Sequence, residues 1–232
     1  MRIRGRWMLI AAALVLSISS AAMAVIYSED FNNAIPGDPA LSGYITATGT
    51  WTVAHDSLGD GFLLFNDPVN YGTIRYNGGS WSNYYQQVLA GMDQGNSQFA
   101  IGGRLNPSGG GYYLICWVGV GILELRRADN FALGGSQTLD AKLFTFSEQH
   151  NYGLHFNGNS ITAYVDGLPI LSGTDSQYSS GSLGFMAGYG TYTWFDNIFV
   201  DEQPPVVPEP SSLIALGSGI AAVGGILRRR II

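Results

Sequence analysis

Cysteine is nearly absent from this chain of 232 residues. The single cysteine, Cys116, cannot form an internal disulfide, so a buried core has to stabilise the fold. Cys116 lies in the apolar run 112–118, which predicts a buried strand thiol that behaves as a small hydrophobe. A nucleophilic role is disfavoured, because the sequence places no base beside it.

Basic residues are also scarce outside the two ends. Residues 25–203 hold five of the 11 Lys and Arg residues but 16 of the 17 acidic ones, so this segment carries a formal charge of −11. Nucleic acid is excluded as a partner, because phosphate binding requires clustered Lys and Arg. An acidic surface of this kind suits bivalent cations or neutral glycans.

Familiar catalytic motifs are missing from the same segment. It has no Gly-x-Ser-x-Gly elbow and no His-Glu-x-x-His zinc motif. The histidines His55, His150 and His155 are scattered along the chain, and His155 alternates with apolar neighbours. We interpret them as ordinary surface histidines.

The N-terminal segment has the three parts of a secretory signal peptide. Three arginines precede an apolar stretch at 7–18, and Ala22-Met23-Ala24 provides a small-x-small site for signal peptidase. We predict cleavage after Ala24, so that residues 1–24 are a signal helix that is removed. The alternative is an uncleaved anchor, which the short apolar stretch disfavours.

The C-terminal segment, residues 204–232, also has three parts. Val207-Pro208-Glu209-Pro210 is followed by an apolar run at 213–227 and by Arg228, Arg229 and Arg230. As a helix, that run is about 22 Å long against roughly 30 Å of hydrocarbon, which predicts a weak anchor. The arginines should stay in the cytoplasm as a membrane stop, with the preceding domain exported.

This arrangement resembles the PEP-CTERM sorting signal of Gram-negative, exopolysaccharide-making bacteria. The resemblance implies export through the inner membrane, transient anchoring there and processing near the Pro-Glu-Pro element by an exosortase. The protein would then reach the cell envelope, the surface or the extracellular matrix. A permanent C-terminal anchor is the alternative.

The segment between these signals predicts an all-β domain. No sustained helical periodicity occurs, and short runs rich in aromatic and β-branched residues are separated by Gly, Asn, Asp and Ser. Asn157-Gly158 and Asp166-Gly167 predict tight hairpins. The predicted strands are 49–54, 61–65, 72–76, 98–105, 112–118, 122–126, 151–156, 160–165, 168–171, 181–187 and 193–200. So many short strands in one domain indicate a β-sandwich or a barrel.

An ordered series of motifs narrows this choice. Ser28-Glu29-Asp30-Phe31-Asn32 opens the domain, and Trp194-Phe195-Asp196-Asn197-Ile198 closes it. Between them lie Gly49-Thr50-Trp51 and the stretch 159–167. The series resembles the concanavalin A-like lectin/glucanase jelly rolls, especially the laminin-G-like and 3-keto-disaccharide-hydrolase-like branches. It implies an antiparallel jelly-roll sandwich over residues 25–203, with the first and last strands paired.

The glucanases of this superfamily carry a Glu-x-Asp-x-x-Glu strand that places two carboxylates on one face. This sequence departs from that pattern, because Leu125 and Arg126 follow Glu124 and Gln149 follows Glu148. The departure argues against glycanase activity, and we identify no catalytic residues. The metal and acid/base cluster of a 3-keto-glycoside hydrolase is not recognisable either.

The resemblance also implies a structural calcium ion where the first and last strands meet. The matching positions are Glu29, Asp30 and Asp196, and calcium prefers such oxygen ligands. The alternative is that these carboxylates are solvated at a strand edge.

Aromatic side chains in loops are the candidates for stacking on sugars, because nothing obliges them to fill the core. The alternative is packing at the rim of the sandwich. In contrast, Trp51, Trp117 and Trp194 lie in predicted strands, and we interpret them as core. The candidates for glycan binding are Trp81, Tyr84, Tyr85, Tyr189 and Tyr192.

Three functions are compatible with the sequence. The first is a non-catalytic exported module that binds glycan or another surface component. The second is a glycan-active enzyme of the same fold with an unrecognised catalytic pair. The third is a structural matrix protein without a specific ligand. Fold alone does not choose among them.

Overall fold

The computed structural model describes residues 25–37, 43–67, 70–92, 98–147, 149–188 and 192–204. The predicted signal helix at 1–24 and the hydrophobic helix at 213–227 lie outside these ranges. Within them, no helix is both long and apolar enough to span a bilayer.

Fifteen strands and one short 3-10 turn, η1 (Val118–Val120), make up the described part of the domain. The strands are β1 (Tyr27–Glu29), β2 (Tyr44–Thr48), β3 (Trp51–His55), β4 (Gly61–Asn66), β5 (Gly72–Tyr76), β6 (Tyr84–Met92), β7 (Gln98–Leu105), β8 (Gly109–Trp117), β9 (Ile122–Asn130), β10 (Gln137–Leu143), β11 (Gln149–Asn157), β12 (Ser160–Val165), β13 (Leu168–Thr174), β14 (Ser182–Ala187) and β15 (Tyr192–Asp201).

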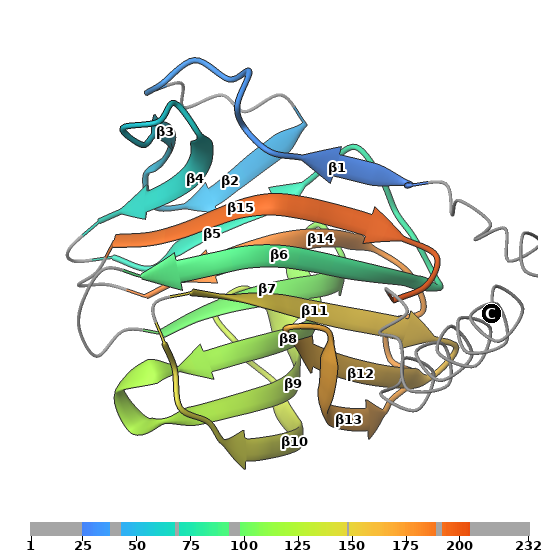
Figure 1. Cartoon of the computed structure of the whole chain (residues 1–232). Coiled ribbons are helices and arrows are strands. Elements are labelled where there is room, and N and C mark those ends of the chain that lie inside the picture. Colours follow the sequence, from blue (N-terminus) through green and yellow to red (C-terminus); the bar gives the residue numbers. More distant parts are fainter. Residues whose placement is uncertain are drawn as a thin grey trace, which may run out of the picture.

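The strands form two antiparallel sheets packed face to face (Figure 1). The eight-stranded sheet has the order β13-β12-β11-β6-β15-β4-β3, with β1 added beside β15. The seven-stranded sheet has the order β10-β9-β8-β7-β14-β5-β2. This is the predicted jelly-roll sandwich.

Alternation along the strands places the core between the sheets. On β8, Tyr112, Leu114 and Cys116 belong to the main buried cluster, and Cys116 is 1% exposed. The intervening Tyr113 and Ile115 belong to a second cluster on the outer face of the seven-stranded sheet. Cys116 therefore packs as a buried strand residue, as predicted, and its burial raises the pKa of the thiol.

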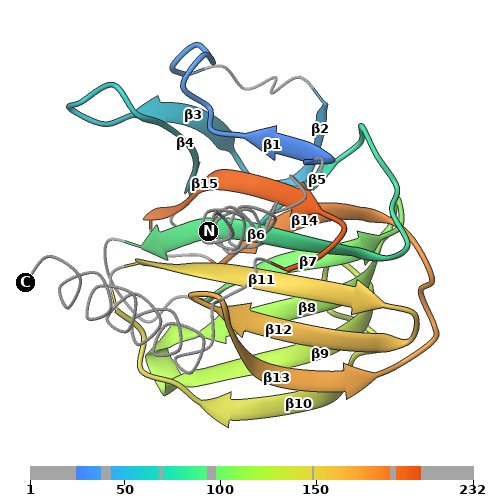
Figure 2. The same cartoon turned by 45° about the vertical axis from the view of Figure 1, so that its right-hand side comes forward.

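The two ends of the domain lie side by side, as predicted. Strand β1 pairs with β15 so that Tyr27 faces Val200 and Glu29 faces Ile198 (Figure 2). The predicted hairpin turns are also present. Gly158 has a φ of 57°, and Asp166 and Gly167 have φ values of 51° and 77°, in the region that such turns require.

Strands β2, β6 and β10 were not predicted. The most consequential of them is β6, which lies between β11 and β15 in the middle of the eight-stranded sheet. Its first two residues, Tyr84 and Tyr85, are both fully buried. The next residue, Gln86, is also buried, and its amide donates to the carbonyl of Gly102 at 2.9 Å. Since both faces of β6 are covered at this end, its sequence lacks the alternation that marks a half-buried strand.

Candidate functional site

A pocket of about 760 Å³ lies on the outer face of the seven-stranded sheet. Its floor comes from β8, β7, β14, β5 and β2, which are neighbours in the sheet. The segment 131–133, between β9 and β10, forms one wall. The lining residues are Thr48, Gly49, Asn70, Tyr71, Thr73, Gln98, Trp117, Phe131, Ala132, Leu133 and Met186.

Trp117 is the largest aromatic side chain in this lining. Its position at the end of β8, in step with Tyr113 and Ile115, turns it away from the main core. The indole Nε1 donates to Glu124 Oε2 on the adjacent strand β9 at 2.8 Å. The guanidinium carbon of Arg126 lies 5.8 Å from the ring centroid. The half-buried ring is therefore held in one orientation at the pocket.

Glu124 holds this arrangement together. The residue is 6% exposed, and its carboxylate accepts hydrogen bonds from Trp117, Thr138 and Arg126. Burial acts to raise the pKa of Glu124, but these hydrogen bonds and the Arg126 charge outweigh it and lower the pKa. Glu124 is thus an ionised acceptor occupied by three side chains, not a free acid.

The wall segment is held by its own turn. Leu133 has a φ of 56°, an uncommon value for a leucine. Its backbone N–H donates to the carbonyl of Asn130 at 3.0 Å, and Gly134 N–H donates to Asn130 Oδ1 at 3.0 Å. Phe131 and Leu133 pack against the outer cluster that contains Met186. The pocket is therefore largely pre-formed.

The remaining lining is polar but uncharged. The hydroxyls of Thr48 and Thr73 are hydrogen-bonded at 2.9 Å, and Asn70 and Gln98 add amide groups. Tyr71 is 44% exposed. Among the described residues that line the pocket, none has a charged side chain, although the domain is strongly acidic. Apolar rings with a few neutral polar groups suit a neutral, hydroxyl-rich ligand.

Two of the aromatic residues predicted to bind glycan are unsuited to it. Tyr84 and Tyr85 lie on β6, not in a loop, and both are fully buried. The Tyr84 hydroxyl accepts a hydrogen bond from the Arg104 N–H at 2.7 Å, and the Tyr85 hydroxyl donates to Gln87 at 2.8 Å. Neither ring is available to a sugar, so the prediction was wrong for these residues.

Trp81 takes the predicted alternative, rim packing. It forms an isolated bridge with Gly181, and its ring stacks on Tyr76 with a centroid separation of 5.9 Å. Of the other two candidates, Tyr189 lies outside the described residues, and Tyr192 begins β15 with 50% of its surface exposed.

Tyr192 lines a second pocket, of about 380 Å³, on the outer face of the eight-stranded sheet. Trp194 lies there too, with Phe62, Asp60 and Asp196. Trp117 and Trp194 are thus surface-facing, and their interpretation as core was wrong, whereas Trp51, at 3% exposure, is core. Apolar residues cover both faces of these strands, so alternation alone did not show which face was outer.

The residues predicted to bind calcium lie near the β1–β15 junction but are engaged locally. Glu29 accepts from Phe31 N–H at 2.9 Å, and Asp30 accepts from Asn32 N–H at 3.1 Å. Asp196 accepts from Asn197 N–H at 2.6 Å. Across the described ranges, no three His, Cys, Asp or Glu side chains are grouped so that they could hold a metal ion. The geometry therefore adds no support for this site.

The predicted sorting residues (Ala22, Ala24, Val207–Pro210 and Arg228–Arg230) lie outside the described residues. Residues 206–230 match the family model of the PEP-CTERM protein-sorting motif. The chain therefore carries this sorting signal, which implies export and exosortase processing. A search of the curated proteins gives no match.

Solved structures share the fold at low sequence identity. The carbohydrate-binding module CBM66 from Bacillus subtilis aligns with a TM-score of 0.58 and 16% identity over 68% of this chain and 95% of that one. The Bacillus licheniformis β-glucanase aligns with a TM-score of 0.56 and 17% identity over 76% and 98%. A Bacillus subtilis protein with a galectin-like fold gives 0.59 and 12% over 79% and 98%. The domain therefore has the concanavalin A-like jelly-roll fold of carbohydrate-binding modules and glucanases, and it is joined to a PEP-CTERM sorting signal.

Proposed function

We propose that this protein is an exported glycan-binding module of the cell envelope or extracellular matrix, and that it binds glycan at a pocket that is itself non-catalytic. The observation that carries the proposal is the uncharged pocket beside Trp117 on an otherwise acidic domain. Its volume falls within the range of about 300–1,000 Å³ typical of small-molecule sites. A short stretch of neutral polysaccharide fits this chemistry, with one sugar face on the indole and its hydroxyls near Asn70, Gln98 and Thr73.

Binding is favoured over hydrolysis by the state of Glu124. A glycosidase needs two carboxyl groups flanking the scissile bond, about 5–10 Å apart. The part of the pocket lining that the structure describes holds no carboxylate, and nearby Glu124 is occupied by Arg126, Trp117 and Thr138. The wild-type protein should therefore bind a neutral glycan without releasing products.

A glycan array, followed by calorimetry on the hits, tests this proposal. Trp117→Ala should weaken binding by about 10-fold or more, because stacking of this kind contributes on the order of 1–3 kcal/mol. Tyr192→Ala is the matched control, since it removes an exposed ring from the other sheet and should leave affinity unchanged. A larger loss of affinity in Tyr192→Ala than in Trp117→Ala would indicate that the binding site lies on the eight-stranded sheet. Products would support an enzyme, and neither binding nor products would support a structural matrix protein.

We also propose a two-step maturation, with cleavage after Ala24 and processing near Pro210. The matched sorting motif supports the second step, and the signal-peptide pattern of residues 1–24 is the ground for the first. Transient anchoring by residues 213–227 would precede delivery to the surface. A mass spectrum of the mature protein tests both steps. Val25 at the N-terminus and a C-terminus near Pro210 are expected, and an intact Arg230 would indicate a permanent anchor.

A further inference from the structure

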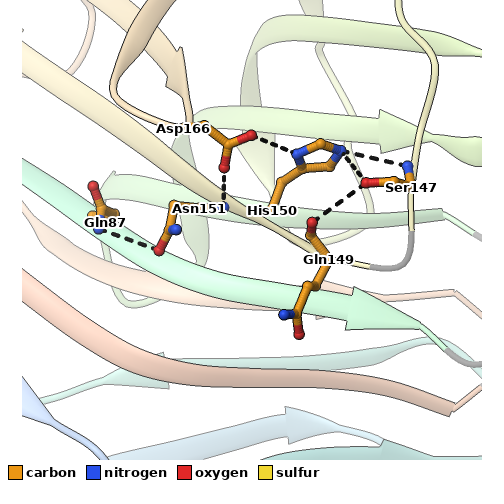
Figure 3. A network of polar contacts seen from close by, with 6 residues as sticks. All are labelled: Gln87, Ser147, Gln149, His150, Asn151 and Asp166. Atoms are coloured by element: carbon orange, nitrogen blue, oxygen red, sulfur yellow. Dashed lines mark hydrogen bonds and ion pairs between the residues drawn. The ribbon is translucent and has the colours of Figure 1, made fainter.

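Three side chains near one end of β11 form a continuous chain of hydrogen bonds. Ser147 Oγ lies 2.8 Å from His150 Nε2, and His150 Nδ1 lies 2.7 Å from Asp166 Oδ2 (Figure 3). Ser147 lies two residues before the start of β11, His150 is the second residue of β11, and Asp166 lies in the β12–β13 turn. The order serine, imidazole, carboxylate is that of a hydrolase triad, which is recognised by geometry and not by sequence position.

Two hydrogen bonds between Asp166 and Asn151 fix the carboxylate of this network to β11. Asp166 N–H donates to the carbonyl of Asn151 at 2.8 Å, and Asp166 Oδ1 accepts from Asn151 N–H at 2.9 Å. The Asn151 side chain in turn accepts from Gln87 Nε2 on β6 at 3.3 Å. Oδ2 is left to face the imidazole (Figure 3).

The imidazole is held in the orientation and tautomer of a general base. The rings of Phe144 and Tyr152 lie edge-on to it at centroid distances of 5.4 and 5.8 Å, and the His150 side chain is 16% exposed. A carboxylate only accepts, so the proton of a neutral His150 resides on Nδ1 and donates to Asp166. The lone pair on Nε2 then faces Ser147, whose Oγ lies at 2.8 Å and whose backbone N–H donates to Nε2 at the longer distance of 3.4 Å.

Ser147 is accessible to a substrate. It is exposed, and Gln149, between it and His150 in sequence, lines the pocket that contains Tyr192 and Trp194. A pocket of mixed polar and apolar lining, which would receive the alcohol part of an ester, therefore begins two residues from the serine. The sequence concealed this site, because Ser147 is not within a Gly-x-Ser-x-Gly elbow.

We propose that Ser147, His150 and Asp166 form a nucleophilic site that hydrolyses small carboxylic esters. Ser147 Oγ attacks the ester carbonyl while His150 Nε2 takes the hydroxyl proton. The C–O bond to the alcohol breaks, the alcohol leaves with that proton, and an acyl-serine remains. Water, deprotonated by His150, attacks the acyl carbon. The bond between that carbon and Ser147 Oγ breaks, His150 returns the proton to Oγ, and a carboxylic acid is released. Asp166 is the positioning residue that holds the tautomer. The site is independent of the glycan pocket.

Covalent labelling of the purified full-length chain tests the nucleophile. A fluorophosphonate probe should form one adduct, which peptide mass spectrometry places on Ser147. Ser147→Ala should abolish it, and His150→Gln, which keeps polar contacts but cannot act as the base, should slow labelling by about 10²–10⁴-fold. Ser176→Ala removes another exposed loop serine and should change nothing. Absence of labelling on the folded wild type, or equal labelling of Ser147→Ala, overturns the proposal.

Hydrolysis of p-nitrophenyl acetate tests the positioning role. Asn tolerates the left-handed backbone of residue 166, so Asp166→Asn should keep the turn. Its kcat should fall by about 10²–10⁴-fold with KM unchanged, because the tautomer of His150 is no longer held. The melting temperature of each variant separates this from a structural role. Variants that melt earlier but retain the wild-type kcat show that the network only fastens the β10–β11 connection.

Discussion

The outer faces of the two sheets shift the pKa of a carboxylate in opposite directions, for buried Glu124 on one face and half-buried Asp196 on the other. On the seven-stranded sheet, Glu124 is paired with Arg126 and hydrogen-bonded to Trp117, and its pKa is lowered. On the eight-stranded sheet, Asp196 lies in the second pocket with Asp60. Burial, followed by the charges of Asp30 and Asp60, raises the pKa of Asp196 to about 6 despite a hydrogen bond from Asn197.

This difference shows how an acidic domain can present an uncharged pocket. The ion pair with Arg126 balances the charge of Glu124 beside Trp117. In the second pocket, the carboxylates of Asp196 and Asp60 instead repel each other. A neutral ligand is therefore better matched to the seven-stranded face. The two faces should also respond to pH with opposite sign.

The largest expected effect comes from Arg104, which lies in the seven-stranded sheet and donates a hydrogen bond to Gly158 in the β11–β12 turn of the eight-stranded sheet. It lies on β7 with 2% exposure, and its guanidinium donates to the carbonyls of Ser82, Gly158 and Tyr178. Arg104→Met should lower the free energy of unfolding by about 3–5 kcal/mol, because three carbonyl oxygens lose charge-assisted donors. Urea denaturation measures this loss.

The matched control is Arg75→Met, on β5 of the same sheet. Arg75 is only partly buried and bonds to Asn77 and Ser182 at the longer distance of 3.3 Å. Its replacement should cost about 1 kcal/mol or less. An equal loss in both variants would show that Arg104 does not tie the sheets together.

The second prediction concerns Glu124→Gln. The variant loses the charged acceptor of Trp117 and Arg126, so we expect about 1–2 kcal/mol less stability at pH 7. Because the folded pKa is lowered, the stabilisation is present above the unfolded value of 4.5 and is lost as pH falls through the folded pKa. Denaturation at several pH values checks this, and a pH-independent difference would contradict it.

The third prediction concerns Asp196→Asn, because the contribution of Asp196 to stability should change with pH in the opposite direction to that of Glu124. The raised pKa of Asp196 favours folding below its unfolded value of 3.8, and this contribution is lost as pH rises through about 6. Asp196→Asn should therefore stabilise the domain at pH 8 by up to about 1 kcal/mol, since solvent screening reduces the effect. Melting curves at pH 8 and pH 4 test it, and a variant that melts earlier at pH 8 refutes it.

The smallest expected effect is that of calcium at Glu29, Asp30 and Asp196. An ion bound only to the folded state raises stability by about 1.4 kcal/mol at ten times its Kd. If these carboxylates bind calcium, the melting temperature will be higher in calcium than in a chelator, and the difference will be smaller in Asp30→Asn. Equal melting temperatures in the two buffers would show that these residues bind no stabilising calcium ion.

The sequence predicted most strands and the hairpin turns because those signals are local. Asp166-Gly167 supplies positive φ angles wherever it occurs, and β12 alternates regularly. Pairing of β1 with β15 also followed from the motif order. Strand β6 was missed because successive residues such as Tyr84 and Tyr85 are buried on both of its faces, so its pattern carries no period.

The site was less predictable than the fold. Tyr84 was predicted to bind glycan but is buried, and Trp117 was predicted to be core but lines the outer pocket. The sequence does not say which face of a strand another sheet covers. Likewise, Ser147 and His150 became partners of Asp166 only when the β12–β13 turn was placed beside β11.

The sequence by itself determined the sorting signal, the acidic charge and the all-β class, since composition and short motifs depend on near neighbours alone. The tertiary structure decided which aromatic rings face solvent and which carboxylates are paired. It also decided that three scattered side chains form one network. Those properties depend on contacts between strands far apart in the chain, and only the packing of the two sheets specifies them.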